Sequence, residues 1–250
     1  MTRVGDDGLG NMLLQEYRRH AIDVTGIVVD KDAQTSATIV SVDRAGERTF
    51  LHTRGCMANF RSADVMNAMN LIKGAKCFVF GYLGLLPELE PDLAVMLKEI
   101  KSQSGIPIVL DTGGAPAKMG AQQLGRILSS VDYFLPSFEE AVRLTGRKTP
   151  EKIVDILLGA GARNVVGVKL GSKGCYVATQ DRREYLRASR VKHPVDTTGA
   201  GDAFVAGFTA GILKGLDPFK AADLGNKVAA SCVTALGAST AIERLGHYMP

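Results

Sequence analysis

The sequence has few of the residues that build metal centres or disulfide scaffolds. Its four cysteines form no Cys-x-x-Cys pair, and each lies in or beside an apolar stretch, which is typical of reduced cysteines in a cytoplasmic protein core. They are Cys56, Cys77, Cys175 and Cys232. The four histidines are far apart and form no His-Glu-x-x-His or His-x-His cluster. A histidine-based metal site is therefore not expected.

Long apolar runs and a strong charge of one sign are also missing. The chain has 30 Lys and Arg residues against 26 Asp and Glu, and its net charge is only +4. The basic residues are spread out, so nucleic acid is not expected as a partner. Residues 1–10 contain no apolar segment, and no stretch reaches the roughly 18 apolar residues that a membrane span requires. We expect a cytoplasmic protein with no membrane partner.

The pattern of apolar residues predicts an α/β fold. A chain of 250 residues is long enough for one large domain, and we expect a single domain over residues 1–250. Short apolar strands alternate with amphipathic helices from residue 64 onward, which predicts a mainly parallel central sheet with helices on both faces. The expected helices cover residues 64–73, 87–102, 121–130 and 139–145, and another begins at Thr149; the expected strands cover residues 77–80, 106–110, 133–135, 164–170, 174–179 and 184–190.

The N-terminal part reads differently. A helix is expected over residues 9–20, and three β-rich runs follow it at residues 26–30, 37–42 and 48–52. Asp43 to Gly46 supplies the turn residues of a hairpin between the last two runs. Residues 26–52 are therefore predicted to form a small β meander.

The most informative segment is a glycine-rich turn at residues 196–204, with the sequence DTTGAGDAF. An almost wholly apolar helix is expected from Ala203 to Leu213, and such a helix must be buried, so its N-terminus is held rigidly. The free N–H groups of Gly199, Ala200 and Gly201 then converge where the helix dipole is positive. This arrangement favours an anion site, and glycine lets a phosphoryl group approach the backbone.

Asp202 stands at the expected cap of this helix. A carboxylate beside an anion site is a poor phosphate ligand but a good acceptor for a hydroxyl proton, which suits phosphoryl transfer to an alcohol. The alternative is that Asp202 is only an N-cap and that the glycines only permit a tight turn. The sequence has no G-x-x-x-x-G-K-[ST] motif and no G-x-G-x-x-G motif. Spacing alone thus leaves an anion site of unknown purpose.

Residues 196–204 resemble, residue for residue, the C-terminal signature of the ribokinase-like (PfkB) carbohydrate kinases. Further segments resemble that family in the same order along the chain, from Arg3 to about Leu245. They are residues 3–10, 136–141, 168–174 and 225–230. The resemblance implies a ribokinase-like fold and transfer of the γ-phosphate of ATP to a hydroxyl of a sugar, sugar acid or nucleoside.

The resemblance also implies roles for individual residues. Asp202 would be the catalytic base and Gly199, Ala200 and Gly201 the anion hole, while Glu140 would organise Mg²⁺ and its waters. The residues implied to bind ATP are Lys169, Gly171 and Gly174 on the phosphate and ribose side, and Asn226 at the nucleotide end. Asp196 and Thr198 are candidates for binding a monovalent cation such as K⁺, as in some relatives.

Two departures from the family pattern stand out. Ser137 occupies a position where the family usually has Asn. The chain also begins after the family's first strand, part of its β lid and its Gly-Gly…Asn segment, which together grip the substrate. We therefore expect residues 26–52 to form a partial lid, Asn59 to lie at the acceptor pocket, and the chain as given to bind nucleotide but to be a poor kinase. A non-catalytic ATP-binding remnant that regulates a partner is the alternative; the acceptor and a homodimeric state stay open.

Overall fold

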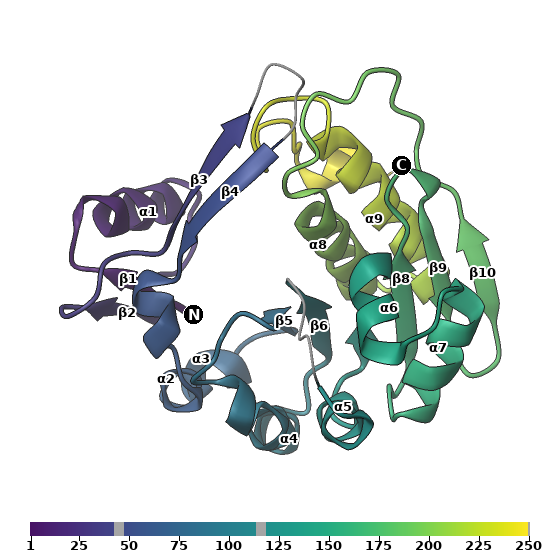
Figure 1. Ribbon diagram of the computed structural model, residues 1–250, viewed down its shortest axis with the longest axis horizontal. Coiled ribbons are helices and arrows are strands. Elements are labelled where there is room, and N and C mark those ends of the chain that lie inside the picture. Colours follow the sequence, from purple (N-terminus) through teal and green to yellow (C-terminus); the bar gives the residue numbers. More distant parts are fainter. Residues whose placement is uncertain (43–47, 114–118, 250) are drawn as a thin grey trace. The chain divides into compact units, whose positions relative to one another are not determined.

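The computed structural model describes residues 1–42, 48–113 and 119–249 and divides them into two compact units (Figure 1). The first unit consists of residues 1–74 and 86–96, and the second of residues 75–85 and 97–250. That residues 1–250 make a single kinase domain stays a prediction.

The second unit is built on one six-stranded sheet with the order β10-β9-β8-β7-β6-β5. Strands β5 to β8 run parallel, whereas β9 and β10 are antiparallel to their neighbours. The bounds are Phe78–Leu83 (β5), Ile108–Thr112 (β6), Tyr133–Phe134 (β7), Val165–Lys169 (β8), Cys175–Ala178 (β9) and Arg183–Leu186 (β10). The predicted mainly parallel sheet is confirmed, and the strands expected at residues 174–179 and 184–190 form an antiparallel pair at its end.

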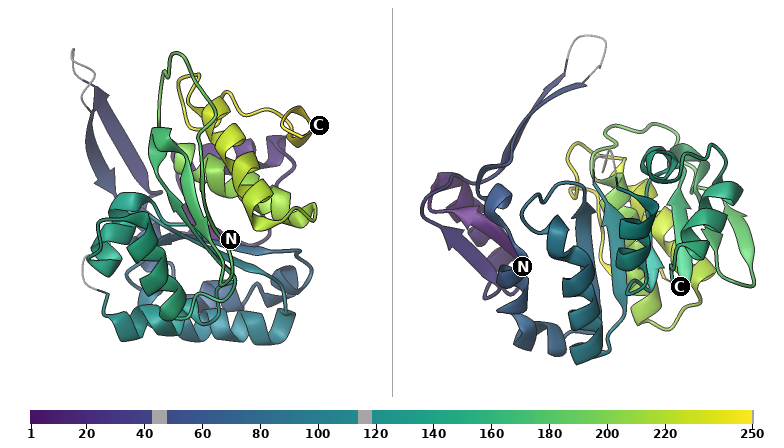
Figure 2. Two further views of the ribbon diagram at one scale, coloured as in Figure 1. Left: turned by 90° about the vertical axis from the view of Figure 1, so that its right-hand side faces the viewer. Right: turned by 60° about the horizontal axis from the view of Figure 1, so that its bottom comes forward.

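Helices cover both faces of this sheet (Figure 2). One face carries the C-terminal part of α4 together with α5, α6 and α7; the other carries α8 and α9. The bounds are Leu93–Ser104 (α4), Ala121–Leu128 (α5), Phe138–Thr145 (α6), Pro150–Gly159 (α7), Ala200–Leu213 (α8) and Pro218–Cys232 (α9), with short 3₁₀ turns at Gly171–Lys173 (η3) and Leu245–His247 (η4). Parallel strands buried on both faces explain why their sequences are continuous apolar runs.

Glycines bring α8 and α9 into unusually close contact. A Cβ atom on Gly207 of α8 would lie 2.9 Å from the Cα of Gly225 on α9. A Cβ atom on Gly225 would lie 2.8 Å from the carbonyl oxygen of Phe204. The rings of Phe204 and Phe208 on α8 stack with a centroid separation of 6.4 Å and are buried against the sheet. Helix α8 is therefore held between the sheet and α9.

The first unit contains two separate strand pairs. Its elements are β1 (Thr2–Gly5), α1 (Gly8–Arg19), β2 (Ile27–Asp30), β3 (Ala37–Val42), β4 (Arg48–Thr53), η1 (Gly55–Asn59), α2 (Ser62–Met66), α3 (Met69–Lys73) and η2 (Glu90–Asp92), with the start of α4. Strand β1 pairs in parallel with β2, and β3 pairs antiparallel with β4. The hairpin of β3 and β4 is confirmed, and its predicted turn at residues 43–46 lies outside the described residues.

The predicted three-stranded meander over residues 26–52 is wrong, because β2 pairs with β1 and not with β3. Two local features explain this result. The chain turns after β2, where Asp30 Oδ1 accepts hydrogen bonds from the N–H groups of Asp32 and Ala33, at 3.0 and 3.1 Å. Strand β1, which the apolar pattern did not reveal, supplies the partner that β2 needs. Within the described ranges, no helix is long and apolar enough to cross a membrane.

We expect Gly225→Ala to lower the free energy of unfolding by about 1–3 kcal/mol, because the new methyl group meets backbone of α8 that cannot move aside easily. Gly159→Ala is the matched control, since a Cβ atom at this helical glycine of α7 would meet nothing within 4 Å. That control should be neutral or stabilising by up to about 1 kcal/mol. Urea unfolding of the two variants measures the difference. Equal stability of the two would contradict the tight contact between α8 and α9.

Candidate active site

Polar residues from neighbouring strands meet at one edge of the parallel sheet. Tyr82 lies near the end of β5, Asp111 near the end of β6 and Lys169 at the end of β8. Ser137, which follows β7, forms an isolated parallel bridge with Lys169. The carboxyl ends of parallel strands lie at the same edge of a sheet, which is the usual binding edge of open α/β folds. Helix α8 begins at this edge: a Cβ atom on Gly201 would lie 3.4 Å from Lys169 Nζ.

Asp111 and Lys169 form a buried ion pair. Lys169 Nζ donates hydrogen bonds to both carboxylate oxygens of Asp111, at 2.7 and 2.6 Å. Burial raises the pKa of Asp111 to about 6, although Lys169 acts in the opposite direction; nearby Glu140 adds to the increase. Sequence reasoning missed Asp111. The available signal was a carboxylate at the end of a wholly apolar strand.

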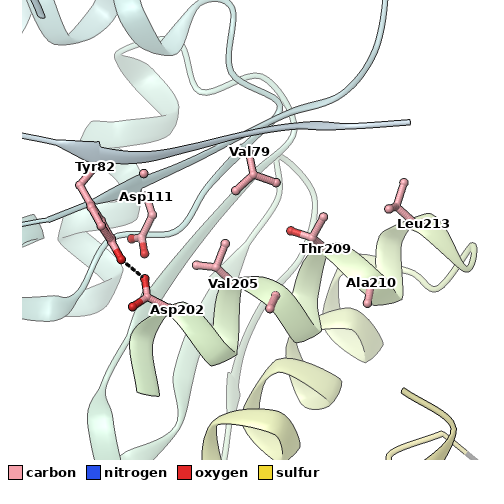
Figure 3. A pocket seen from close by; sticks show the side chains of 10 residues that line it. Val79, Tyr82, Asp111, Asp202, Val205, Thr209, Ala210 and Leu213 are labelled. Atoms are coloured by element: carbon pink, nitrogen blue, oxygen red, sulfur yellow. Dashed lines mark hydrogen bonds between the residues drawn. The ribbon is translucent and has the colours of Figure 1, made fainter. Parts of the chain in front are cut away.

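Helix α8 starts earlier than its apolar residues predict. Its N-cap is Gly199, whose φ of 78° lies in the left-handed region, and the helix runs from Ala200. Asp202 is therefore the third residue of the first turn, and the prediction that it stands at the cap is wrong. Glycine is required at the cap, because a Cβ atom on Gly199 would also lie 2.6 Å from the Cβ of Ala238. The side chain of Asp202 is exposed at the pocket edge (Figure 3).

The first turn of α8 provides N–H groups for an anion, since such groups have no acceptor within their own helix. One of the three predicted donors is already partly used: the N–H of Ala200 donates to the carbonyl oxygen of Thr197 at 3.3 Å. The ammonium group of Lys169, which is paired with Asp111, lies beside Gly201. The combination of dipole and ammonium suits a phosphoryl group. That Gly199, Ala200 and Gly201 form an anion hole stays a prediction.

Asp196 lies beneath this loop and holds it in place. Its Oδ1 accepts a hydrogen bond from the N–H of Thr198 at 2.9 Å, and its Oδ2 accepts one from the N–H of Gly237 at 3.0 Å. The side chain is buried. Asp196 thus connects the start of the loop to the segment that follows α9. That Asp196 and Thr198 bind a monovalent cation stays a prediction.

Glu140 is buried at the start of α6 and forms a capping box with Ser137. Its Oε2 accepts hydrogen bonds from the N–H of Ser137 at 3.0 Å, from Ser137 Oγ at 2.6 Å and from Thr112 Oγ1. The serine that departs from the family pattern is therefore hydrogen-bonded to Glu140, the residue that the resemblance implies for organising Mg²⁺. Because Thr112 follows Asp111, Glu140 lies beside the buried ion pair.

Three of the predicted ATP-binding residues shape the backbone. Gly171 and Gly174 have φ angles of 59° and 98° in the turn between β8 and β9. A Cβ atom on Gly174 would lie 2.0 Å from the carbonyl oxygen of Leu186. Asn226 on α9 is buried, and its Nδ2 donates to the carbonyl oxygen of Arg187 at 3.2 Å. Contact of these residues with a nucleotide stays a prediction.

Asn59 belongs to the first unit, where it joins a partly buried polar network. Its Nδ2 donates a hydrogen bond to Asp30 Oδ2 at 3.1 Å. The same oxygen accepts a hydrogen bond from Arg3 at 2.9 Å, and Arg3 in turn binds Asp64 through two further nitrogens. These contacts hold η1 and α2 against β1 and β2. The contact of Asn59 with an acceptor stays a prediction.

A cavity of about 500 Å³ opens between β5 and α8 (Figure 3). Its polar lining consists of Tyr82, Asp111, Asp202 and Thr209; apolar residues such as Val79 and Val205 line the rest. The Tyr82 hydroxyl donates a 2.5 Å hydrogen bond to Asp202 Oδ1. Tyr82 has no sequence motif of its own, and its position near the carboxyl end of an apolar strand was the only available signal.

We expect Lys169→Met to raise the pKa of Asp111 further above about 6, because the ammonium group favours the ionised carboxylate. Titration of the carboxyl ¹³C chemical shift measures the pKa directly. Lys101→Met is the matched control, since Lys101 forms a comparable 2.7 Å ion pair with Asp132. It should leave Asp111 unchanged. A fall in the pKa of Asp111 in Lys169→Met would show that the ion pair has been assigned the wrong electrostatic role.

Known proteins resemble this chain over nearly its whole length. The sequence matches the pfkB family carbohydrate kinases over residues 1–245. It is 30% identical to the 2-dehydro-3-deoxygluconokinase of Bacillus subtilis over 249 residues, which covers 95% of this chain and 75% of that protein. It is 29% identical to the ribokinase of Staphylococcus aureus over 251 residues, with 98% and 79% covered.

Solved structures show the same fold. The ribokinase of Arabidopsis thaliana complexed with ribose and ATP is similar with a TM-score of 0.84 at 22% identity, covering 99% of this chain and 79% of that one. A putative ribokinase II from E. coli in complex with ATP and Mg²⁺ has a TM-score of 0.81 at 23% identity, with 99% and 80% covered. With the family match over residues 1–245, the chain belongs to the pfkB family of carbohydrate kinases.

Proposed function

We propose that this protein transfers the γ-phosphate of ATP to a hydroxyl of a sugar, sugar acid or nucleoside, with Asp202 as the catalytic base. One observation carries the proposal: an exposed carboxylate and a lysine ammonium lie together at the first turn of a buried apolar helix. The ammonium and the helix dipole favour the transferred phosphoryl group, while the carboxylate can accept the proton of the attacking hydroxyl.

The reaction divides between two sets of groups. The N–H groups of Gly199, Ala200 and Gly201, with Lys169, bind the γ-phosphoryl oxygens and oppose the charge that develops there. Asp202 accepts the proton as the acceptor oxygen attacks the γ-phosphorus. The bond between that phosphorus and the β–γ bridging oxygen breaks, and ADP leaves. Gly171, Gly174 and Asn226 are proposed to bind the remaining parts of ATP.

Two carboxylates, those of Asp111 and Glu140, lie close together at this edge of the sheet and offer oxygen atoms to Mg²⁺ or to its waters. Oxygen ligands are those that Mg²⁺ prefers, and it usually keeps several of its waters. The described residues contain no group of three or more His, Cys, Asp or Glu side chains that could hold a metal ion. We therefore propose that Glu140 holds Mg²⁺ through water and that Asp111 balances the charge of Lys169. When bound, the ion neutralises charge on the ATP phosphates.

The acceptor is proposed from the relatives. They are named for 2-dehydro-3-deoxygluconate, ribose and fructose, and a nucleoside kinase of the same fold was solved with inosine. These four compounds form the acceptor panel for the experiments below. Asn59 is proposed as an acceptor-binding residue and the hairpin within residues 26–52 as a partial lid. Asp196 and Thr198 are proposed to bind K⁺.

Mg-ATP should raise the thermal unfolding midpoint, because a ligand that binds only the folded state stabilises it by about 2.7 kcal/mol at a hundredfold excess over its Kd. Gly199→Ala should abolish this shift by distorting the anion hole. Gly215→Ala is the matched control: it also replaces a glycine at positive φ, but at the other end of α8 and in open space. A folded wild-type protein that does not respond to millimolar Mg-ATP would exclude the proposed nucleotide site.

Asp202→Asn should reduce turnover by about 10²–10⁴-fold, which is the usual contribution of a positioned base. The affinity for ATP should change little, because backbone groups and Lys169 hold the phosphates. ADP release with each member of the acceptor panel measures turnover. Asp217→Asn at the N-cap of α9 is the control and should behave as wild type. Wild-type turnover in Asp202→Asn would refute the assignment of the base; ATP binding without transfer to any acceptor would favour the non-catalytic alternative.

A further inference from the structure

Tyr82 reaches the proposed base from a distant part of the sequence. Its hydroxyl donates a hydrogen bond to Asp202 Oδ1 at 2.5 Å, although the two residues are 120 positions apart (Figure 3). Burial raises the pKa of the Tyr82 phenol well above its usual value, and the hydrogen bond to Asp202 adds to the increase. The hydroxyl therefore keeps its proton, and remains a donor, throughout the pH range in which a kinase operates.

The ring of Tyr82 is held in this direction by the backbone of the next strand. A Cβ atom on Gly113, directly after β6, would lie 2.3 Å from both Cβ and Cγ of Tyr82 and 2.6 Å from its Cδ1. The backbone at this point is fixed in turn, because the N–H of Gly113 donates to the carbonyl oxygen of Leu83 at 3.1 Å. The ring thus lies against a glycine that leaves room for it, and no larger residue could replace that glycine without moving the ring.

The hydrogen bond from Tyr82 restricts the orientation of the Asp202 side chain, which packing does not fix. Its side chain is exposed on the first turn of α8, so its neighbours in the helix do little to restrict its rotamers. A catalytic carboxylate must present one oxygen in a fixed direction, since a general base acts only within hydrogen-bond reach of the proton it takes. A donor that binds the other oxygen provides this restriction.

We propose that Tyr82 is a positioning residue for phosphoryl transfer, which binds Oδ1 of Asp202 so that Oδ2 faces the acceptor hydroxyl. This inference rests on the proposed function, because it requires Asp202 to be the base. Tyr82 belongs to none of the groups proposed to bind ATP. Its loss should consequently affect the chemical step and leave nucleotide binding intact.

Tyr82→Phe tests the inference by removing the hydroxyl and keeping the ring. Losing a hydrogen bond to a charged group typically weakens the interaction by an amount that corresponds to about a 10-fold change in a rate or equilibrium constant. We therefore expect kcat to fall by about 10-fold, while the KM for ATP stays within about twofold. The assay is ADP release with the acceptor panel and with water alone as acceptor. Tyr185→Phe is the matched control. Tyr185 donates an equally short hydrogen bond, 2.5 Å long, to Glu151 from β10 at the opposite edge of the same sheet, and its loss should not change turnover.

A double-mutant cycle separates positioning from other effects. Tyr82→Phe should cause no further loss when it is added to Asp202→Asn, because positioning has no effect once the base is gone. An equal further loss in that background, or a wild-type kcat in Tyr82→Phe while Asp202→Asn is inactive, would overturn the role of Tyr82 and leave the proposed function standing. Wild-type turnover in Asp202→Asn would overturn both.

Gly113→Ala provides a second route to the same answer if Tyr82→Phe folds poorly. This variant keeps the hydroxyl but pushes the ring away from its position. We expect a loss of kcat similar to that of Tyr82→Phe, again with little change in the KM for ATP. Full kcat in a folded Gly113→Ala protein would overturn the inference, because it would mean that the direction of the ring does not matter.

Discussion

The burial of helix α8 between the sheet and α9 is the constraint on which the candidate site depends. The helix is almost entirely apolar, so it is stable only where both sides are covered. Gly207 and Gly225 let it approach α9 closely, and the rings of Phe204 and Phe208 anchor it among the buried residues of the sheet. Its position is thereby fixed to within the tolerance of core packing. The first turn, which carries the N–H groups and Asp202, is consequently fixed as well.

A helix fixed in this way brings positive potential to one edge of the sheet, and the strand ends bring charged groups to meet it. Asp111 and Lys169 balance one another, which matters because burying one charge without the other is strongly unfavourable. Glu140 is stabilised by Ser137 and Thr112. The site therefore contains two buried carboxylates, Asp111 and Glu140, and one exposed carboxylate, Asp202, whose Oδ1 accepts a hydrogen bond from Tyr82.

The sequence predicted the parts of this arrangement that have local signatures. The apolar runs predicted the parallel sheet, and the motif at residues 196–204 located the loop and the helix that carries Asp202. The role of Asp202 as the base stays a prediction. Asp111 and Tyr82 were missed because each is a single polar residue at a strand end. Such a residue joins a site only through its neighbours on adjacent strands, and the sequence does not show which strands are adjacent. The start of α8 was misplaced because glycine at the cap and alanine after it give no side-chain capping signal. The pairing of β1 with β2 was missed for a similar reason, since a four-residue strand has almost no periodicity of its own.

The hydrogen bonds also divide the predicted site residues into two kinds. Asp196, Asn226 and Glu140 are buried, and each binds backbone groups of neighbouring segments, so these side chains hold loops and helix ends in place whatever else they bind. Asp202 is exposed, and its Oδ1 accepts a hydrogen bond from a side chain of a different element. A side chain that bonds to backbone groups in this way can match the family motif because it stabilises the fold. Asp202 differs from these residues, because it is exposed and lies in the same first helical turn as Gly201, which is beside Lys169. A carboxylate that stabilised only the helix would require no hydrogen bond from Tyr82 on another strand.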